Sequence, residues 1–162
     1  MRTGRWFRRA AAGAVISLVA GCGGGQAVQL ERGDGPAPSM RWNAVLSTPG
    51  NLTGVAQVRG QGWMASAEDA GRTLAAIRIE NATPGGRHPW HVHRGRCGMD
   101  QGILGEPSSY ELLEVGGDGR AEEEATVDLQ LPTSGEYMIN VHASPENMST
   151  VIACGNLAQP IR

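Results

Sequence analysis

Apolar and polar residues alternate with a period of two along most of the chain after residue 40. In segment 73–80, "TLAAIRIE", one face receives the apolar side chains of Ala75, Ile77 and Ile79. Segment 120–129 is the clearest case, since its charged and polar residues fall almost entirely on one face. Successive side chains of a strand point to opposite faces, so this alternation predicts strands rather than helices.

Turn-forming residues separate the alternating segments at short intervals. The residues "TPGN" lie between segments 41–47 and 52–60, which predicts a first hairpin there. The stretch "EYMINVH" alternates again, and we expect Tyr137, Ile139 and Val141 to point inward. Beyond the N-terminal region no segment has the period of a helix. The chain is therefore predicted to be all-β, an antiparallel sandwich or barrel.

Residues 1–21 have the composition of an export signal. Four arginines and no acid precede a run of eleven small and apolar residues, which is too short to span a bilayer. The run ends in "LVAGC", which resembles the signal of bacterial lipoproteins and implies cleavage before Cys22 and a lipid on its sulfur. We expect an exported lipoprotein that faces the periplasm or the cell exterior and contacts the membrane through this lipid only. An ordinary secretory signal followed by a chance cysteine is the alternative.

The rest of the chain divides into a tether and one domain. Residues 22–40 are rich in glycine and proline and lack periodicity, which is typical of a flexible linker. Residues 41–162 carry the alternating pattern and are long enough to bury one core. We therefore expect a lipidated tether over residues 22–40 and a β-domain over residues 41–162.

The charge of the exported chain excludes one class of partner. The sequence has fourteen arginines, no lysine and sixteen acidic residues. Loss of the signal removes four arginines, so the net charge falls from −2 to about −6. A nucleic-acid-binding domain needs a basic face to contact phosphates, so we expect no nucleic-acid partner.

The cysteine count agrees with the lipoprotein interpretation. Three cysteines would leave one unpaired in an oxidising compartment. If Cys22 carries the lipid, Cys97 and Cys154 remain as an even pair. Their oxidation would close a long loop and stabilise the fold by roughly 4 kcal/mol, a contribution that small exported domains commonly need.

Three of the four histidines lie within residues 87–98, "RHPWHVHRGRCG". On an extended strand His91 and His93 point to the same face, and His142 ends another predicted strand. Three imidazoles that converge from two strands suit copper or zinc rather than magnesium or calcium. The alternative is a set of histidines that face solvent or form hydrogen bonds on a β-surface. The scarcity of histidine elsewhere in the chain disfavours that alternative.

Several motifs resemble those of the copper/zinc superoxide dismutases. "RHPWHVHRGRC" is similar to the copper-site strand of that family, and "INVHASPEN" to the strand of its third copper-only histidine. "VIACGNL" is similar to its C-terminal strand, which carries the second cysteine of a disulfide. "WNAVLSTPGNLTGVAQV" is similar to its first hairpin, so the resemblance covers residues 41–158. It implies an eight-stranded Greek-key β-barrel or sandwich of immunoglobulin-like architecture.

The resemblance also implies roles for individual residues and a single copper ion as cofactor. It implies three copper ligands, one supporting histidine that bonds backbone beside the site, and one disulfide. The implied copper ligands are His91, His93 and His142. The supporting histidine is His88, and the disulfide joins Cys97 and Cys154.

The chain departs from the family pattern after Cys97. The family has a histidine there that bridges copper and zinc, followed by further zinc ligands, whereas residues 98–119 contain no histidine. We therefore expect no zinc and no bridging fourth ligand. Asp100 and Glu106 could supply a fourth ligand, and their spacing selects neither of them.

The charged groups that guide superoxide in the family are reduced as well. Val151 stands where the family places an arginine three residues before the second cysteine. Arg94 and Arg96 lie beside the ligand strand and could attract an anion, because a cation near the metal raises the association rate of anions. A solvated strand end is the alternative for both arginines. Glu146 fits either an acceptor for a ligand imidazole or a plain turn.

Three functions fit these features. The first is a copper-only superoxide dismutase that converts superoxide to oxygen and hydrogen peroxide. The second is a periplasmic lipoprotein that binds and buffers copper without turnover, and the third is a metal-free β-domain that binds another partner. Copper binding is better supported than catalysis, since the bridging imidazole that supplies protons in the family is missing.

Overall fold

The computed structural model describes residues 41–52, 56–69 and 71–160, which form mainly β-strands. The predicted signal of residues 1–21, Cys22 and the tether of residues 22–40 lie outside the described residues. Within the described ranges no α-helix occurs, and no helix is long and apolar enough to cross a membrane. The elements are β1 (Arg41–Ser47), β2 (Arg59–Ser66), β3 (Thr73–Glu80), β4 (Arg87–His88), β5 (Trp90–Arg96), β6 (Met99–Ile103), the 3-10 helix η1 (Pro107–Ser109), β7 (Leu113–Glu114), β8 (Ala121–Val127), β9 (Tyr137–Ser144) and β10 (Asn147–Leu157).

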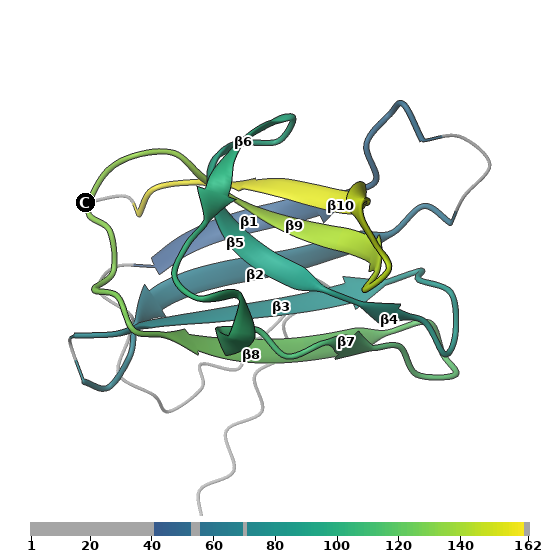
Figure 1. Cartoon of the computed structure of the whole chain (residues 1–162), viewed down its shortest axis with the longest axis horizontal. Coiled ribbons are helices and arrows are strands. Elements are labelled where there is room, and N and C mark those ends of the chain that lie inside the picture. The colour runs from purple at the N-terminus through teal and green to yellow at the C-terminus, as the bar shows by residue number, and fades with distance from the viewer. Residues whose placement is uncertain (1–40, 53–55, 70, 161–162) are drawn as a thin grey trace, which may run out of the picture. The chain divides into compact units, whose positions relative to one another are not determined.

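Eight of these strands form one antiparallel sheet, which curls into a half-barrel (Figure 1). The strand order is β6-β5-β9-β10-β1-β2-β3-β8, and the short strands β4 and β7 pair separately with each other. β6 and β8 are the two edges of the sheet. The prediction of an all-β, antiparallel domain is confirmed.

The core consists of the apolar residues on one face of each strand. β8 shows the predicted alternation clearly, because Ala121, Ala125 and Val127 are buried while Glu122 and Glu124 are exposed. Aromatic side chains pack edge to face within the core: the rings of Trp42 and Tyr137 are 5.4 Å apart, and those of Trp90 and Tyr110 are 5.2 Å apart. Burial of this apolar face is the main force that stabilises the sheet.

The second strand begins later than its sequence pattern predicts. Among the described residues of segment 52–60, only Arg59 and Gly60 lie in a strand. β2 continues through "GQGWMAS", where a Cβ atom at Gly60 would lie 2.4 Å from the carbonyl oxygen of Arg78. A Cβ atom at Gly62 would lie 2.4 Å from the Ile139 side chain. Both glycines are needed for close packing, and they hide the apolar alternation that marks a strand.

β9 differs from the predicted pattern because both of its faces are buried. Ile139 and Val141 are in the core as expected, and Tyr137 is half-buried against it. The opposite face, which carries Asn140 and His142, is also less than one-tenth exposed. Alternation of polarity predicted the strand correctly, but it could not predict that the polar face is covered.

Candidate metal centre

Three histidines from two neighbouring strands converge on one point. His91 and His93 lie on β5, His142 lies on β9, and one nitrogen from each ring lies within 4.8 Å of the others. The ring centroids are 5.6 Å apart for His91 and His93, 5.5 Å for His91 and His142, and 5.9 Å for His93 and His142. This grouping can hold a single metal ion.

The three imidazoles are buried, and burial changes their protonation. Each histidine is only 4–5% exposed. Burial lowers the pKa of His91 from 6.5 to about 4 and also lowers the pKa of His142, because a low-dielectric surrounding disfavours the charged imidazolium. Both rings are therefore neutral at neutral pH, which is the form that binds a metal ion.

Several nitrogens of the cluster lack any hydrogen-bond partner. Nδ1 of His91, Nε2 of His93 and both ring nitrogens of His142 are buried and have no hydrogen bond within 3.5 Å among the described residues. The backbone of Met148 is near enough to His142 to offset part of the lowering of its pKa. A buried polar atom without a partner costs free energy, so native proteins rarely contain such a group of them. A bound ion would provide the missing partner for one nitrogen of each ring, so the residues present fit a metal ion with imidazole ligands.

Asp100 supports the cluster from behind His93. Its Oδ1 atom accepts a hydrogen bond from Nδ1 of His93 at 2.9 Å and another from the backbone N–H of Gly102 at 2.7 Å. With a proton on Nδ1, the lone pair of His93 is on Nε2, the nitrogen that has no partner. Asp100 therefore contacts the candidate ligand His93 but does not itself belong to the group of three donor histidines. The β5–β6 hairpin that brings Asp100 back to His93 is not evident in the sequence.

The other acidic candidates stand apart from the cluster. Glu106 precedes η1 and is exposed, and Glu146 is exposed in the turn between β9 and β10. A hydrogen bond from Ser144 lowers the pKa of the Glu146 carboxyl. Neither glutamate belongs to the group of clustered donor atoms, which consists of the three histidines alone among the described residues.

His88 ties β4 to the end of β9. Its Nδ1 lies 3.1 Å from the carbonyl oxygen of His142 and 2.9 Å from that of Ala143, so a proton on Nδ1 is donated to backbone beside the cluster. The ring of His88 is buried and does not belong to the three-histidine group. This placement gives His88 a role in fixing the backbone of His142.

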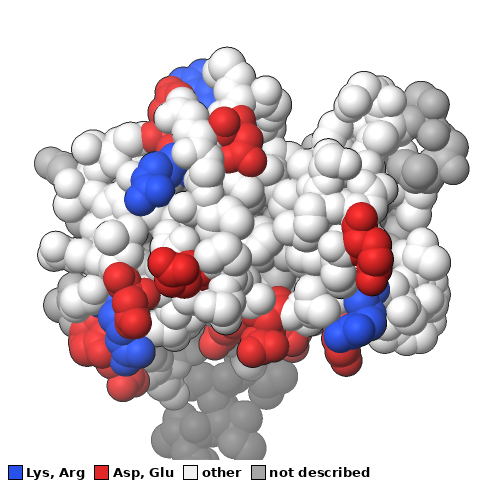
Figure 2. Space-filling view, in the orientation of Figure 1, with Lys and Arg blue, Asp and Glu red and all other residues white. Residues whose placement is uncertain are grey.

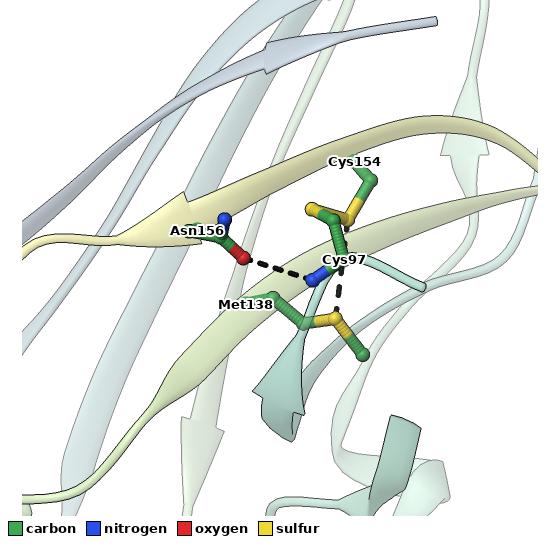
Figure 3. Close-up of a disulfide and its surroundings, with 4 residues drawn as sticks. All are labelled: Cys97, Met138, Cys154 and Asn156. Atoms are coloured by element: carbon green, nitrogen blue, oxygen red, sulfur yellow. Dashed lines mark hydrogen bonds between the residues drawn. A yellow bond between two sulfur atoms is a disulfide. The ribbon is translucent and has the colours of Figure 1, made fainter. Parts of the chain in front are cut away.

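A disulfide fixes the hairpin that carries Asp100 (Figure 3). Cys97, between β5 and β6, is joined to Cys154 on β10, with 5.9 Å between their Cα atoms. The backbone N–H of Cys97 also donates to Oδ1 of Asn156 at 2.9 Å. The predicted pairing is confirmed, and it anchors the β5–β6 hairpin to the body of the sheet.

The two arginines beside the ligand strand have contacts of their own. Arg94 donates to the carbonyl oxygen of Ile103 at 3.2 Å, and Arg96 forms an ion pair with Glu136. Both arginines are exposed, and the pairing of β5 with β6 is irregular between His93 and Gly95. Acidic residues lie along the lower part of the face seen in Figure 2, with arginines beside several of them.

Val151 lies on β10 directly opposite His142, in an irregular part of the β9–β10 pairing. An uncharged side chain therefore stands in the strand position that faces the third histidine. The cluster consequently has an acidic support in Asp100 and no cation at this neighbouring position.

No known protein family matches the chain, and no curated protein matches it either. The fold and the site by themselves describe an all-β domain with a buried three-histidine group that could hold a metal ion.

Proposed function

We propose that this protein is an exported, copper-binding protein of the superoxide dismutase type, anchored by a lipid on Cys22. The observation that carries the proposal is the group of three buried imidazoles with unpaired nitrogens on two adjacent strands. Imidazole nitrogens suit copper in both of its common oxidation states. The histidine-free stretch after Cys97 favours one copper ion and no zinc.

The strand arrangement supports a Greek-key fold of that family. β3 and β8 are neighbours in the sheet, although the intervening strands β4 to β7 lie elsewhere. The connections from β3 to β5 and from β6 to β8 therefore cross between the two halves of the sheet, as Greek-key connections do. The order of the histidine and cysteine motifs along the chain agrees with this assignment.

The proposed reaction converts two superoxide anions and two protons into one oxygen and one hydrogen peroxide. One superoxide gives up an electron, and the other accepts an electron and two protons. Copper, when bound, supplies this one-electron chemistry by alternating between two oxidation states. His91, His93 and His142 hold the ion, Asp100 orients His93, and His88 fixes the backbone of His142. Protons come from water, since the bridging imidazole of the family has no counterpart here.

Copper buffering without turnover is a second candidate, and the burial of the histidines favours it. The three rings are 4–5% exposed, so little of the donor cluster is open to a substrate from solvent. In this case the same residues would hold copper, and the lipid anchor would keep the protein at the membrane.

One experiment separates these functions. The purified protein is loaded with copper, its retained metal is measured, and superoxide decay is followed by stopped flow. We expect one retained copper per chain and decay faster than with the same amount of free aqueous copper. Retention of copper without faster decay would leave the buffering function, and failure to retain copper would reject both metal functions.

A further inference from the structure

Asn140 is a buried polar residue on the same strand as His142. Its side chain is 4% exposed, and its Oδ1 atom is buried without a hydrogen-bond partner. A buried amide oxygen without a partner is as unusual as the unpaired nitrogens of the histidines. The Oδ1 atom of Asn140, like the histidine nitrogens, therefore needs a partner that the described residues do not provide.

The register of β5 and β9 places Asn140 beside the histidines. Asn140 is paired directly with His91 across the two antiparallel strands. Residues paired in this way have side chains on the same face, with Cβ atoms roughly 5 Å apart. His142 lies two residues further along β9 and therefore also shares this face. Asn140 thus has one candidate ligand across from it and another next to it.

The convergence of the rings places Asn140 at the middle of the cluster. His93 is paired with Met138, so its position on β5 is four residues away, or about 13 Å along the strand, from the position of His142. The centroids of the His93 and His142 rings are nevertheless only 5.9 Å apart. Both rings must lean toward each other over the residues between them, which are His91 on β5 and Asn140 on β9.

We propose that the amide oxygen of Asn140 is the fourth ligand of the metal ion, an inference that rests on the proposed copper function. Three imidazole nitrogens and one amide oxygen form a donor set that suits Cu(II). An amide oxygen is a hard donor, and Cu(I) prefers softer ligands, so Asn140 stabilises the oxidised state of the ion more than the reduced state. It takes the place of a fourth imidazole, which the described part of the chain does not offer at this cluster.

The test compares Asn140→Leu and Asn140→Asp with the wild-type protein. Leucine keeps the approximate volume of the side chain and removes the oxygen donor, whereas aspartate keeps an oxygen donor and adds a charge. Affinities are measured separately for Cu(II) and for Cu(I), and the electron paramagnetic resonance spectrum of the Cu(II) protein is recorded. Asn43→Leu, at an exposed position of β1, is the matched control for replacing an asparagine in a strand.

We expect Asn140→Leu to weaken Cu(II) binding by about tenfold, to change Cu(I) binding by less than about twofold and to alter the resonance spectrum. Asn140→Asp should restore Cu(II) binding, and Asn43→Leu should change none of these quantities. An unchanged spectrum and an unchanged ratio of the two affinities in Asn140→Leu would overturn the proposal. An equal loss of both affinities would overturn it too, since that result indicates a packing role.

Failure of this inference is distinguishable from failure of the proposed function. If the wild-type protein retains no copper, the metal centre itself is wrong. If the wild type binds copper and Asn140→Leu binds Cu(II) and Cu(I) as the wild type does, the centre stands and only the assignment of Asn140 falls.

Discussion

The two halves of the sheet differ in what lies on their second face. In β1 and β8, buried residues largely alternate with exposed ones, so the polar face of each strand is solvated. In β5 and β9, the residues from Trp90 to His93 and from Met138 to His142 are all buried. A polar face is costly to bury unless its groups have partners. The half that buries its polar face is the one that contains the three-histidine group that could hold a metal ion.

Removal of one clustered histidine should have the largest effect, because it should abolish metal binding in the half of the sheet whose polar face is buried. We expect His142→Ala to lose stable copper binding altogether, because the two remaining histidines come from one strand and no longer enclose the ion from two sides. Copper retained after gel filtration and measured by atomic absorption tests this. His88→Gln is the comparison, since His88 is outside the donor group and a glutamine amide can still donate to the backbone carbonyls beside His142, so this variant should retain one copper. Stoichiometric binding by His142→Ala would contradict the three-histidine centre.

A core substitution in the other half should separate stability from metal binding. Ile79 on β3 is fully buried, so Ile79→Ala should lower the free energy of unfolding by about 3 kcal/mol through lost burial and a cavity. Urea unfolding measures the change, and Val45→Ala, at a side chain 77% exposed, should change little. The copper stoichiometry of folded Ile79→Ala should remain that of the wild type. Loss of copper binding by the folded variant would show that the two halves are not independent.

Acid should destabilise the metal-free protein through its buried histidines. The pKa of His91 is about 4 in the folded protein and about 6.5 in the unfolded chain, so the unfolded chain binds more protons between these values. The free energy of unfolding should therefore fall as the pH is lowered from about 6.5 to about 4, and this contribution should be fully present above that window. Denaturant unfolding at a series of pH values measures it. His91→Gln should show a shallower dependence, and an unchanged dependence would contradict the assignment.

Loss of the carboxylate behind His93 should weaken the site without removing it. Asp100→Asn should lower copper affinity by roughly 10- to 100-fold, as is typical when the partner of a ligand imidazole is lost. Competition with a chelator of known affinity measures the change. Asp118→Asn is the control, because Asp118 accepts a hydrogen bond within a turn remote in sequence from the cluster. Equal affinities of Asp100→Asn and the wild type would show that the contact with His93 is incidental.

A new cation beside the cluster should have the smallest effect. Val151 is paired with His142, so Val151→Arg would place a positive charge near the histidines. If the copper protein consumes superoxide, the variant should do so a few-fold faster at low ionic strength, and the gain should shrink as salt screens the charge. Stopped-flow decay at two salt concentrations measures both effects. A gain that does not depend on salt would argue against guidance by charge.

Much of the fold could be predicted because its signals are local. Alternation in segments 73–80 and 120–129 depends only on neighbouring residues, and the strands β3 and β8 appear there. The sequence pattern predicts the second strand too early, because Gly60 and Gly62 carry no side chain that could show an alternation. The two glycines make room for the backbone of Arg78 and the side chain of Ile139. Both residues are distant in sequence, so the local pattern cannot show this contact.

The sequence by itself determined the residue types of the site: two histidines on one face of a strand, a third on another strand, and a pair of cysteines. The tertiary structure alone decided what surrounds them. It paired Asn140 with His91, returned Asp100 to His93 through a hairpin, and covered the polar face of β9. The physical reason is register, because strand pairing between residues some fifty positions apart is set by the packing of the whole sheet rather than by local periodicity.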